Sequence, residues 1–178
     1  MFDDIRQKSE WESIERISKG WSADEKYYIR TREGKSLLLR CSDIGKYEAK
    51  KKEYEMIKRC SQLGFLMSAP VDFGICNQGK TVFMLLTWME GEDLEQVLPR
   101  LSADKQYMLG RKAGAILKKI HSLPVEQADI PQDTKKEKKL AQLSRYEQSQ
   151  VRMEQDQAVI DYVRQNMDQI WKEKPVYL

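Results

Sequence analysis

The pattern of apolar side chains changes once along the chain, near Glu90, and this change limits the folds that are available to it. Before Glu90 the apolar residues occur in short runs that favour strands, interrupted by one segment with helical spacing. After Gly91 the apolar residues recur at the spacing of amphipathic helices. The sequence therefore predicts an α+β protein divided into a strand-rich part, 1–90, and a helical part, 91–178.

The strand-rich part reads as two hairpins separated by a helix. Four strands are predicted by short apolar runs between turn residues, at 27–29, 36–41, 71–76 and 81–89. The last of these is apolar enough to be buried on both faces. Between the hairpins, residues 46–63 have the spacing of an amphipathic helix that ends at Gly64.

Charge and composition exclude several classes of function. The 31 Lys and Arg exceed the 28 Asp and Glu by only +3, which gives no reason to expect a nucleic acid or a membrane surface as partner. The longest apolar run, 82–86, is far shorter than the roughly 20 residues that cross a bilayer. Acids near the amino terminus are atypical of a signal peptide, so a cytoplasmic protein is expected.

The three cysteines do not indicate a metal site or a disulfide framework. Cys41, Cys60 and Cys76 are odd in number and widely spaced, and His121 is the single histidine. We therefore expect three reduced and mostly buried thiols.

One segment, 74–81, matches the phosphate-binding pattern G-x-x-x-x-G-K-[ST] in every position. In a nucleotide-binding loop of that type the next element is a helix, whose amino terminus faces the phosphates. Here the next residues form the apolar run 82–86, which predicts a buried strand. We therefore interpret the segment as a hairpin turn in which Gly79 adopts a positive φ.

A second pattern combines a cation on a strand with a carboxylate on the following helix. Arg40 lies near the end of the predicted strand 36–41, and Glu53 lies within the predicted helix. Such a pair can hold a cation where it reaches nucleotide phosphates. The alternative is a surface ion pair, which would contribute at most about 1 kcal/mol.

With these elements in this order, the sequence resembles the aminoglycoside phosphotransferase-like kinases, relatives of the protein kinases that phosphorylate small molecules. The resemblance covers about 11–178 and is carried jointly by several loose patterns, at 37–40, 53–57, 69–71, 89–94 and 117–124. It implies a protein-kinase-like amino-terminal lobe, with an antiparallel sheet of about five strands and one helix, followed by the helices of an incomplete carboxy-terminal lobe. It also implies transfer of the γ-phosphate of ATP or GTP, with Mg²⁺, to a hydroxyl of a small molecule or antibiotic.

The resemblance implies a role for individual residues at the nucleotide. Arg40 stands where the family has its phosphate-binding cation, and an Arg forms a bidentate fork to phosphate or carboxylate oxygens. Glu53 is its expected helix partner, with Glu48 and Glu55 as competitors. The family has a structural histidine at the end of the corresponding helix, so the resemblance implies that His121 is a packing or capping residue.

Further nucleotide contacts are implied in a loop and in the hinge between lobes. Ser22 is a candidate contact in the loop that follows the first strand, although it equally fits a role within its own turn. The backbone of Thr87 and Met89 is expected to present an acceptor and a donor to the adenine ring. Base rates favour core packing for the Met89 side chain, which is compatible with a hinge that uses only main chain.

Phosphoryl transfer in this superfamily requires a catalytic loop of the form H-G-D-x-x-x-x-N and a later Asp that holds the metal. The chain contains neither, so no catalytic residue is predicted within it, and the metal ligands are expected in a missing segment. We expect a truncated kinase, inactive alone, whose exposed helical surface is covered by a carboxy-terminal fragment or by another copy. The alternatives are a non-catalytic kinase-like module that binds nucleotide or a partner protein, and a nucleoside triphosphatase built on segment 74–81.

Overall fold

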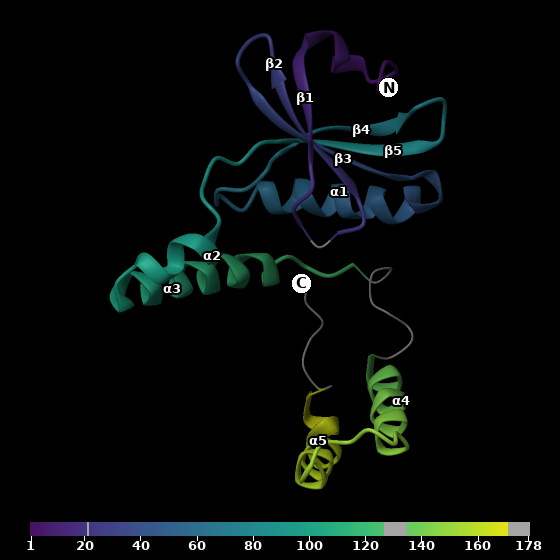
Figure 1. Cartoon of the computed structure of the whole chain (residues 1–178), viewed down its shortest axis with the longest axis vertical. Helices are drawn as coiled ribbons and strands as arrows, with labels where there is room; N and C mark the ends of the chain where they lie inside the picture. The colour runs from purple at the N-terminus through teal and green to yellow at the C-terminus, as the bar shows by residue number, and fades with distance from the viewer. Residues whose placement is uncertain (21, 127–134, 171–178) are drawn as a thin grey trace. The chain divides into compact units, whose positions relative to one another are not determined.

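Five antiparallel strands form one sheet with the order β1-β2-β3-β5-β4 (Figure 1). In this computed structural model, residues 1–20, 22–126 and 135–170 are described. The strands are β1 (Trp11–Ile17), β2 (Glu25–Thr31), β3 (Ser36–Asp43), β4 (Pro70–Cys76) and β5 (Thr81–Thr87). Together with one helix between β3 and β4, they confirm the predicted α+β class and the predicted kinase-like sheet.

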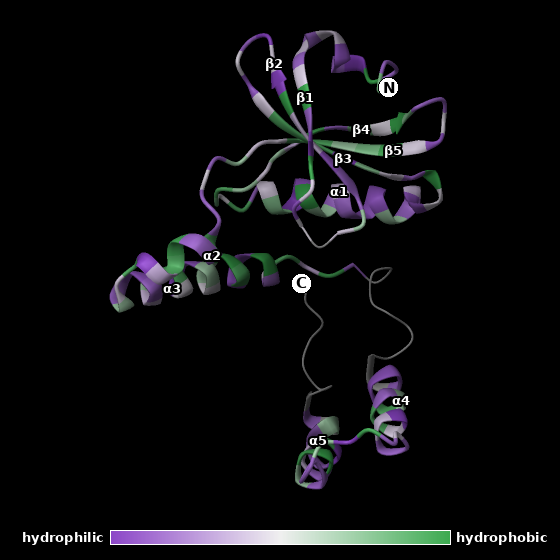
Figure 2. Cartoon of the chain, viewed as in Figure 1, coloured by the Kyte–Doolittle hydropathy of each residue, from purple (hydrophilic) through white to green (hydrophobic). Residues whose placement is uncertain are grey.

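The helix α1 (Tyr47–Ser61) lies against one face of the sheet, where it contacts β4 and β5 (Figure 1). A short turn of 3-10 helix, Ile44–Lys46, leads into α1, and the Asp43 side chain accepts a hydrogen bond from the Gly45 amide at its start. Figure 2 shows α1 as largely hydrophilic with hydrophobic positions between. Its apolar side chains Tyr54 and Ile57 pack with Met84 and Leu86 of β5.

Alternation along the strands gives the sheet two different faces. Leu37, Leu39 and Cys41 of β3 belong to a buried cluster on one face, whereas Leu38 packs with the α1 cluster on the other. The five consecutive residues 82–86 of β5 are each at most 5 % exposed. This confirms that β5 is buried on both faces, because α1 covers one side and the amino-terminal segment the other.

The amino-terminal segment is part of the core, which the sequence did not indicate. Phe2 is 2 % exposed and meets the Tyr27 ring edge-on, with 5.2 Å between ring centroids. The short 3-10 helix Arg6–Glu10 then leads to Trp11, the first residue of β1. The first residues are also tied to the β4–β5 turn, because the Phe2 amide donates to Asn77 Oδ1 at 3.0 Å.

The segment that matches a phosphate-binding loop is a hairpin turn, as the sequence predicts. Strand β4 ends at Cys76 and strand β5 begins at Thr81, so no helix follows the lysine. Asn77, Gln78 and Gly79 all have positive φ, at 54°, 59° and 83°. A loop of this kind lacks the helix amino terminus that makes a phosphate-binding loop work.

The three cysteines are free thiols and all are buried, as predicted. Cys41 and Cys76 lie in the cluster between the sheet and the amino-terminal segment, and Cys60 lies on α1. Burial raises the pKa of Cys41 to about 12 and that of Cys76 to about 11.

The second part is helical, with α2 (Leu94–Val97), α3 (Ala103–His121), α4 (Lys135–Glu147) and α5 (Gln157–Ile170). The chain divides into two compact units, 1–119 and 120–178, and the lobe boundary predicted at residue 90 stays a prediction. In the second unit, the carboxylate of Asp156 accepts hydrogen bonds from Tyr146 at 2.7 Å and from Arg152 at 2.6 Å. No helix in the described part of the chain is long and apolar enough to span a bilayer.

Several apolar side chains of the helices and of the segment between α4 and α5 are exposed to solvent. On α3 they are Tyr107, Met108, Leu109 and Leu117, and in the second unit they include Val151, Met153, Val159 and Tyr162. Ile160 and Met167 of α5 are buried. His121 ends α3, and its buried Nε2 has no hydrogen-bond partner among the described residues.

Candidate functional site

The alternation of β3 places Arg40 on the face of the sheet that α1 covers. Its neighbours on β3, Leu39 and Cys41, point into the opposite core. In the sheet register Arg40 lies between Lys26 of β2 and Met84 of β5. Its side chain is 19 % exposed, so the guanidinium is largely enclosed.

Glu53 on α1 is the acid that reaches Arg40. Arg40 Nη1 lies 2.6 Å from Glu53 Oε1. Of the two competitors, Glu55 instead pairs with Lys58 at 3.0 Å, and Glu48 is an exposed residue of the first turn of α1. The structure thus brings together the strand cation and the helix carboxylate that the sequence singled out; their role at a nucleotide stays a prediction.

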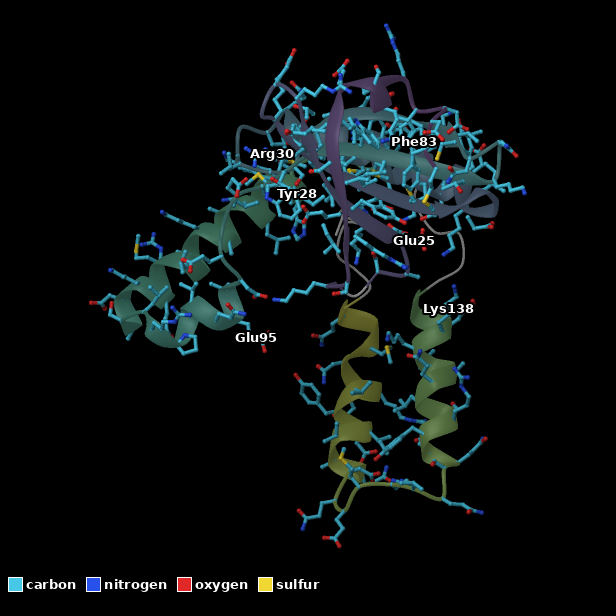
Figure 3. All side chains as sticks on the ribbon, turned by 45° about the horizontal axis from the view of Figure 1, so that its top comes forward. Glu25, Tyr28, Arg30, Phe83, Glu95 and Lys138 are labelled. Atoms are coloured by element: carbon cyan, nitrogen blue, oxygen red, sulfur yellow. The ribbon has the colours of Figure 1, made fainter. Side chains whose placement is uncertain are left out.

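Asp24, Ser42 and Lys50 complete the cluster, and sequence reasoning missed all three as members. Asp24 Oδ2 lies 2.5 Å from Arg40 Nη2 and 2.8 Å from Lys50 Nζ, while Ser42 donates to Asp24 Oδ1 at 2.6 Å. Lys50 also lies 2.9 Å from Glu53 Oε2. Two cations and two carboxylates therefore alternate around one small site, next to the start of β2 that Glu25 marks in Figure 3.

The cluster holds its acids ionised. Burial by itself raises the pKa of Asp24, but hydrogen bonds from Lys50, Ser42 and Arg40 outweigh it and bring the pKa to about 2. Burial likewise opposes ionisation of Glu53, and the hydrogen bond from Lys50 and the charge of Arg40 lower its pKa nevertheless. The pKa of Arg40 is raised, because the two carboxylates outweigh its burial.

The loop that contains Ser22 is tied to the segment that follows the sheet. Ser22 is exposed and makes no hydrogen bond within the described residues, so the structure does not bring it to the cluster. Lys19 reaches across to Asp93, with Nζ 2.7 Å from Oδ2. In the same loop, Gly20 has φ +112°, a conformation that favours glycine.

Strand β5 ends at Thr87, two residues earlier than predicted, and this creates the segment between sheet and helices. The Thr87 amide donates to the Ala69 carbonyl at 2.8 Å, and the Trp88 amide donates to the Ser36 carbonyl at 3.0 Å. Pairing stops there because β3 begins at Ser36. In the described part of the chain the Met89 amide donates no backbone hydrogen bond, and its role at a nucleotide stays a prediction.

Arg40, Lys50 and Ser42 form a donor set suited to an oxyanion. A guanidinium, an ammonium and a hydroxyl converge on one carboxylate, which is the arrangement that binds phosphate oxygens. For a metal ion the described residues offer less, since they contain no group of three or more His, Cys, Asp or Glu side chains placed to hold one.

Comparison with models of known protein families shows to which family this chain belongs. The family model of the phosphotransferase enzyme family, APH, matches residues 13–178. The chain belongs to this family. No curated protein matches it. The match confirms the resemblance inferred from the sequence.

Solved structures share the fold of this family member at low identity. The streptomycin–ATP ternary complex of APH(2″)-IIa has a TM-score of 0.59 at 18 % identity. The match covers 96 % of this chain and 59 % of the APH(2″)-IIa chain. The GDP complex of aminoglycoside 2′-phosphotransferase-IIIa has a TM-score of 0.59 at 21 % identity, and the match covers 97 % of this chain and 56 % of that protein. Amicoumacin kinase hAmiN with AMP-PNP, Ca²⁺ and Ami has a TM-score of 0.50 at 16 % identity, and the match covers 96 % of this chain and 51 % of the kinase. The chain therefore spans between half and three-fifths of these proteins.

Proposed function

We propose that this chain is the nucleotide-binding part of a kinase that transfers the γ-phosphate of ATP or GTP to a hydroxyl of a small molecule or antibiotic. The observation that carries the proposal is the Arg40–Glu53 pair on the α1 face of the sheet. The same guanidinium also binds the Asp24 carboxylate, which shows that it can hold an anion. Family membership supports it, and so do neighbours whose structures contain ATP, GDP or AMP-PNP.

The phosphates and the adenine ring of the nucleotide both have candidate contacts in the chain. Arg40 would bind phosphate oxygens through its guanidinium fork, and Glu53 would fix the direction of that fork. The adenine ring would meet the backbone of Thr87 and Met89, and the exposed Ser22 would contact the nucleotide from the loop before β2. The bound nucleotide supplies the phosphoryl group, and these residues hold and orient it.

We further propose that the 178 residues by themselves bind nucleotide without transferring phosphate. Support comes from the sequence, in which the single histidine, His121, is followed by Ser122 and not by the Gly-Asp of a catalytic loop. Mg²⁺ would be held mainly by residues of a missing segment. The acceptor molecule would likewise be selected there, and the exposed apolar side chains of α3 would be covered by that segment or by a second copy.

Binding of ATP tests the proposed function directly. Equilibrium dialysis of the purified chain with labelled ATP should show binding that Arg40→Ala weakens about tenfold, because a charge-assisted contact is lost. Lys80→Ala is the matched control: it removes a cation from the exposed hairpin turn and should leave ATP binding unchanged. If Lys80→Ala abolishes binding while Arg40→Ala does not, the triphosphatase alternative replaces this one.

A non-catalytic kinase-like module is the second candidate, favoured by the lack of a catalytic loop in these residues. The two candidates differ in a chain extended through an H-G-D segment. The kinase would then transfer labelled phosphate, whereas the module would bind nucleotide without turnover. Transfer by the 178 residues alone would contradict the proposed inactivity. A cytoplasmic location is also proposed, supported by the three free cysteines.

A further inference from the structure

Asp24 is a buried carboxylate whose partners come from two other elements of the fold. Its side chain is 4 % exposed. Arg40 and Ser42 reach it from β3, and Lys50 reaches it from α1. Asp24 itself lies in the loop immediately before β2. The donors therefore belong to regular secondary structure, and the acceptor belongs to a loop.

The two cations converge on a single oxygen of this carboxylate. Arg40 Nη2 and Lys50 Nζ lie 2.5 Å and 2.8 Å from Asp24 Oδ2. Lys50 is 15 % exposed, and its other contact is Glu53 Oε2 at 2.9 Å. Glu53 thus supports both cations from the α1 side, and Asp24 is the anion that they share on the loop side.

An anion that binds Arg40 must therefore take over the contacts of Asp24 or compete with them. A phosphate group offers oxygens of the same charge to the same three donors. We propose that Lys50 is a second nucleotide-phosphate-binding residue beside Arg40, and that the Asp24 carboxylate occupies in the free protein the position that a phosphate group takes. This inference rests on the proposed function.

Competition by Asp24 has a direct consequence for affinity. With a pKa of about 2, the carboxyl is ionised throughout the neutral range, so it competes with phosphate at every working pH. Removal of its charge should strengthen binding of ATP, whereas loss of a purely structural residue should weaken it. Adenosine, which has no phosphate, should not respond to either cation.

The test measures binding of labelled ATP and of labelled adenosine to the full chain by equilibrium dialysis. Asp24→Asn should tighten ATP binding several-fold, and Lys50→Met should weaken it about tenfold, with adenosine unchanged in both. Lys50→Met should also weaken ATP binding in the Asp24→Asn background, because the ammonium touches phosphate directly. Lys50→Arg, which keeps the cation, should restore most of the affinity.

Two matched controls remove the same charges elsewhere. Lys58→Met breaks a lysine–glutamate pair elsewhere on α1, with Glu55, and Glu33→Gln removes a surface carboxylate paired with Lys35 at 2.8 Å. Neither should change ATP binding by more than the experimental scatter. They separate the effect of the site from the effect of net charge.

Three results overturn the inference. The first is ATP binding that Asp24→Asn leaves unchanged or weakens, and the second is a Lys50→Met variant that costs nothing in the Asp24→Asn background. Absence of ATP binding in the wild-type chain is the third, and it also refutes the proposed function, whereas the first two leave that function intact. Thermal unfolding checks that each variant is folded. If Asp24→Asn does not fold, Asp24→Ser replaces it. The role of Lys50 is then decided by comparing the ATP affinities of Lys50→Met and Lys50→Arg in the wild-type background.

Discussion

Arg40 and Glu53 are joined by a contact of 2.6 Å between Nη1 and Oε1, which links β3 to α1. Glu53→Gln keeps the shape of the side chain and removes its charge, so the guanidinium is held less firmly. We expect ATP affinity to fall about tenfold and the free energy of unfolding to fall by about 1 kcal/mol. Calorimetric titration and urea denaturation measure the two effects. Glu55→Gln is the control on the same helix, and an equal loss there would refute a specific role for Glu53.

Acid should destabilise the protein in a window set by Asp24. Its pKa is about 2 in the folded state and about 3.8 without the fold, so folding favours the ionised form. That stability is present above pH 4 and is lost as the pH falls towards 2, and it amounts to about 2 kcal/mol. Urea denaturation between pH 2 and 5 should show a shallower pH dependence for Asp24→Asn than for the wild type. Parallel curves would contradict this.

The burial of Phe2 makes the amino-terminal residues important for stability. Phe2→Ala empties a space beside Tyr27, and we expect the free energy of unfolding to fall by about 3 kcal/mol. Met1→Ala, at a side chain that is 71 % exposed, should change it by less than about 0.5 kcal/mol. Chemical denaturation distinguishes the two variants. Similar small effects would show that the first residues do not contribute to the core.

The same glycine-to-alanine change should have opposite effects at two positions. Gly79 in the hairpin turn has φ +83°, so Gly79→Ala should destabilise the protein by about 1 kcal/mol. Gly110 lies within α3 with no atom within 4 Å of an added Cβ, so Gly110→Ala should stabilise the helix by about 0.5 kcal/mol. Thermal unfolding of both variants tests the pair. A stabilising change at Gly79 would contradict the positive φ.

The sheet and its helix could be predicted because their signals are local. The apolar run that precedes Arg40 indicates a strand, and the spacing around Glu53 indicates a helix; the family pattern then places them opposite each other. The end of β5 at Thr87 was harder, because the apolar run continues to Met89 while the partner strand does not.

The rest of the site depends on contacts between distant residues. Asp24 sits in a turn, where an aspartate is ordinarily explained by its own backbone. Lys50 is the first of three consecutive lysines, and composition does not distinguish them; only its spacing of three from Glu53 placed it on the same side of α1. The burial of Phe2 carried no signal, because two aspartates follow it.

The three buried thiols can serve as internal probes of local opening, because their rates of chemical labelling depend on how often each becomes exposed. A cysteine-alkylating reagent can reach Cys41 and Cys76 only when the layer beneath the amino-terminal segment opens, and it can reach Cys60 only when α1 loosens. Mass spectrometry after brief labelling therefore reads the two sides of the sheet separately. Slower labelling in the presence of a nucleotide would reveal which side that nucleotide stiffens.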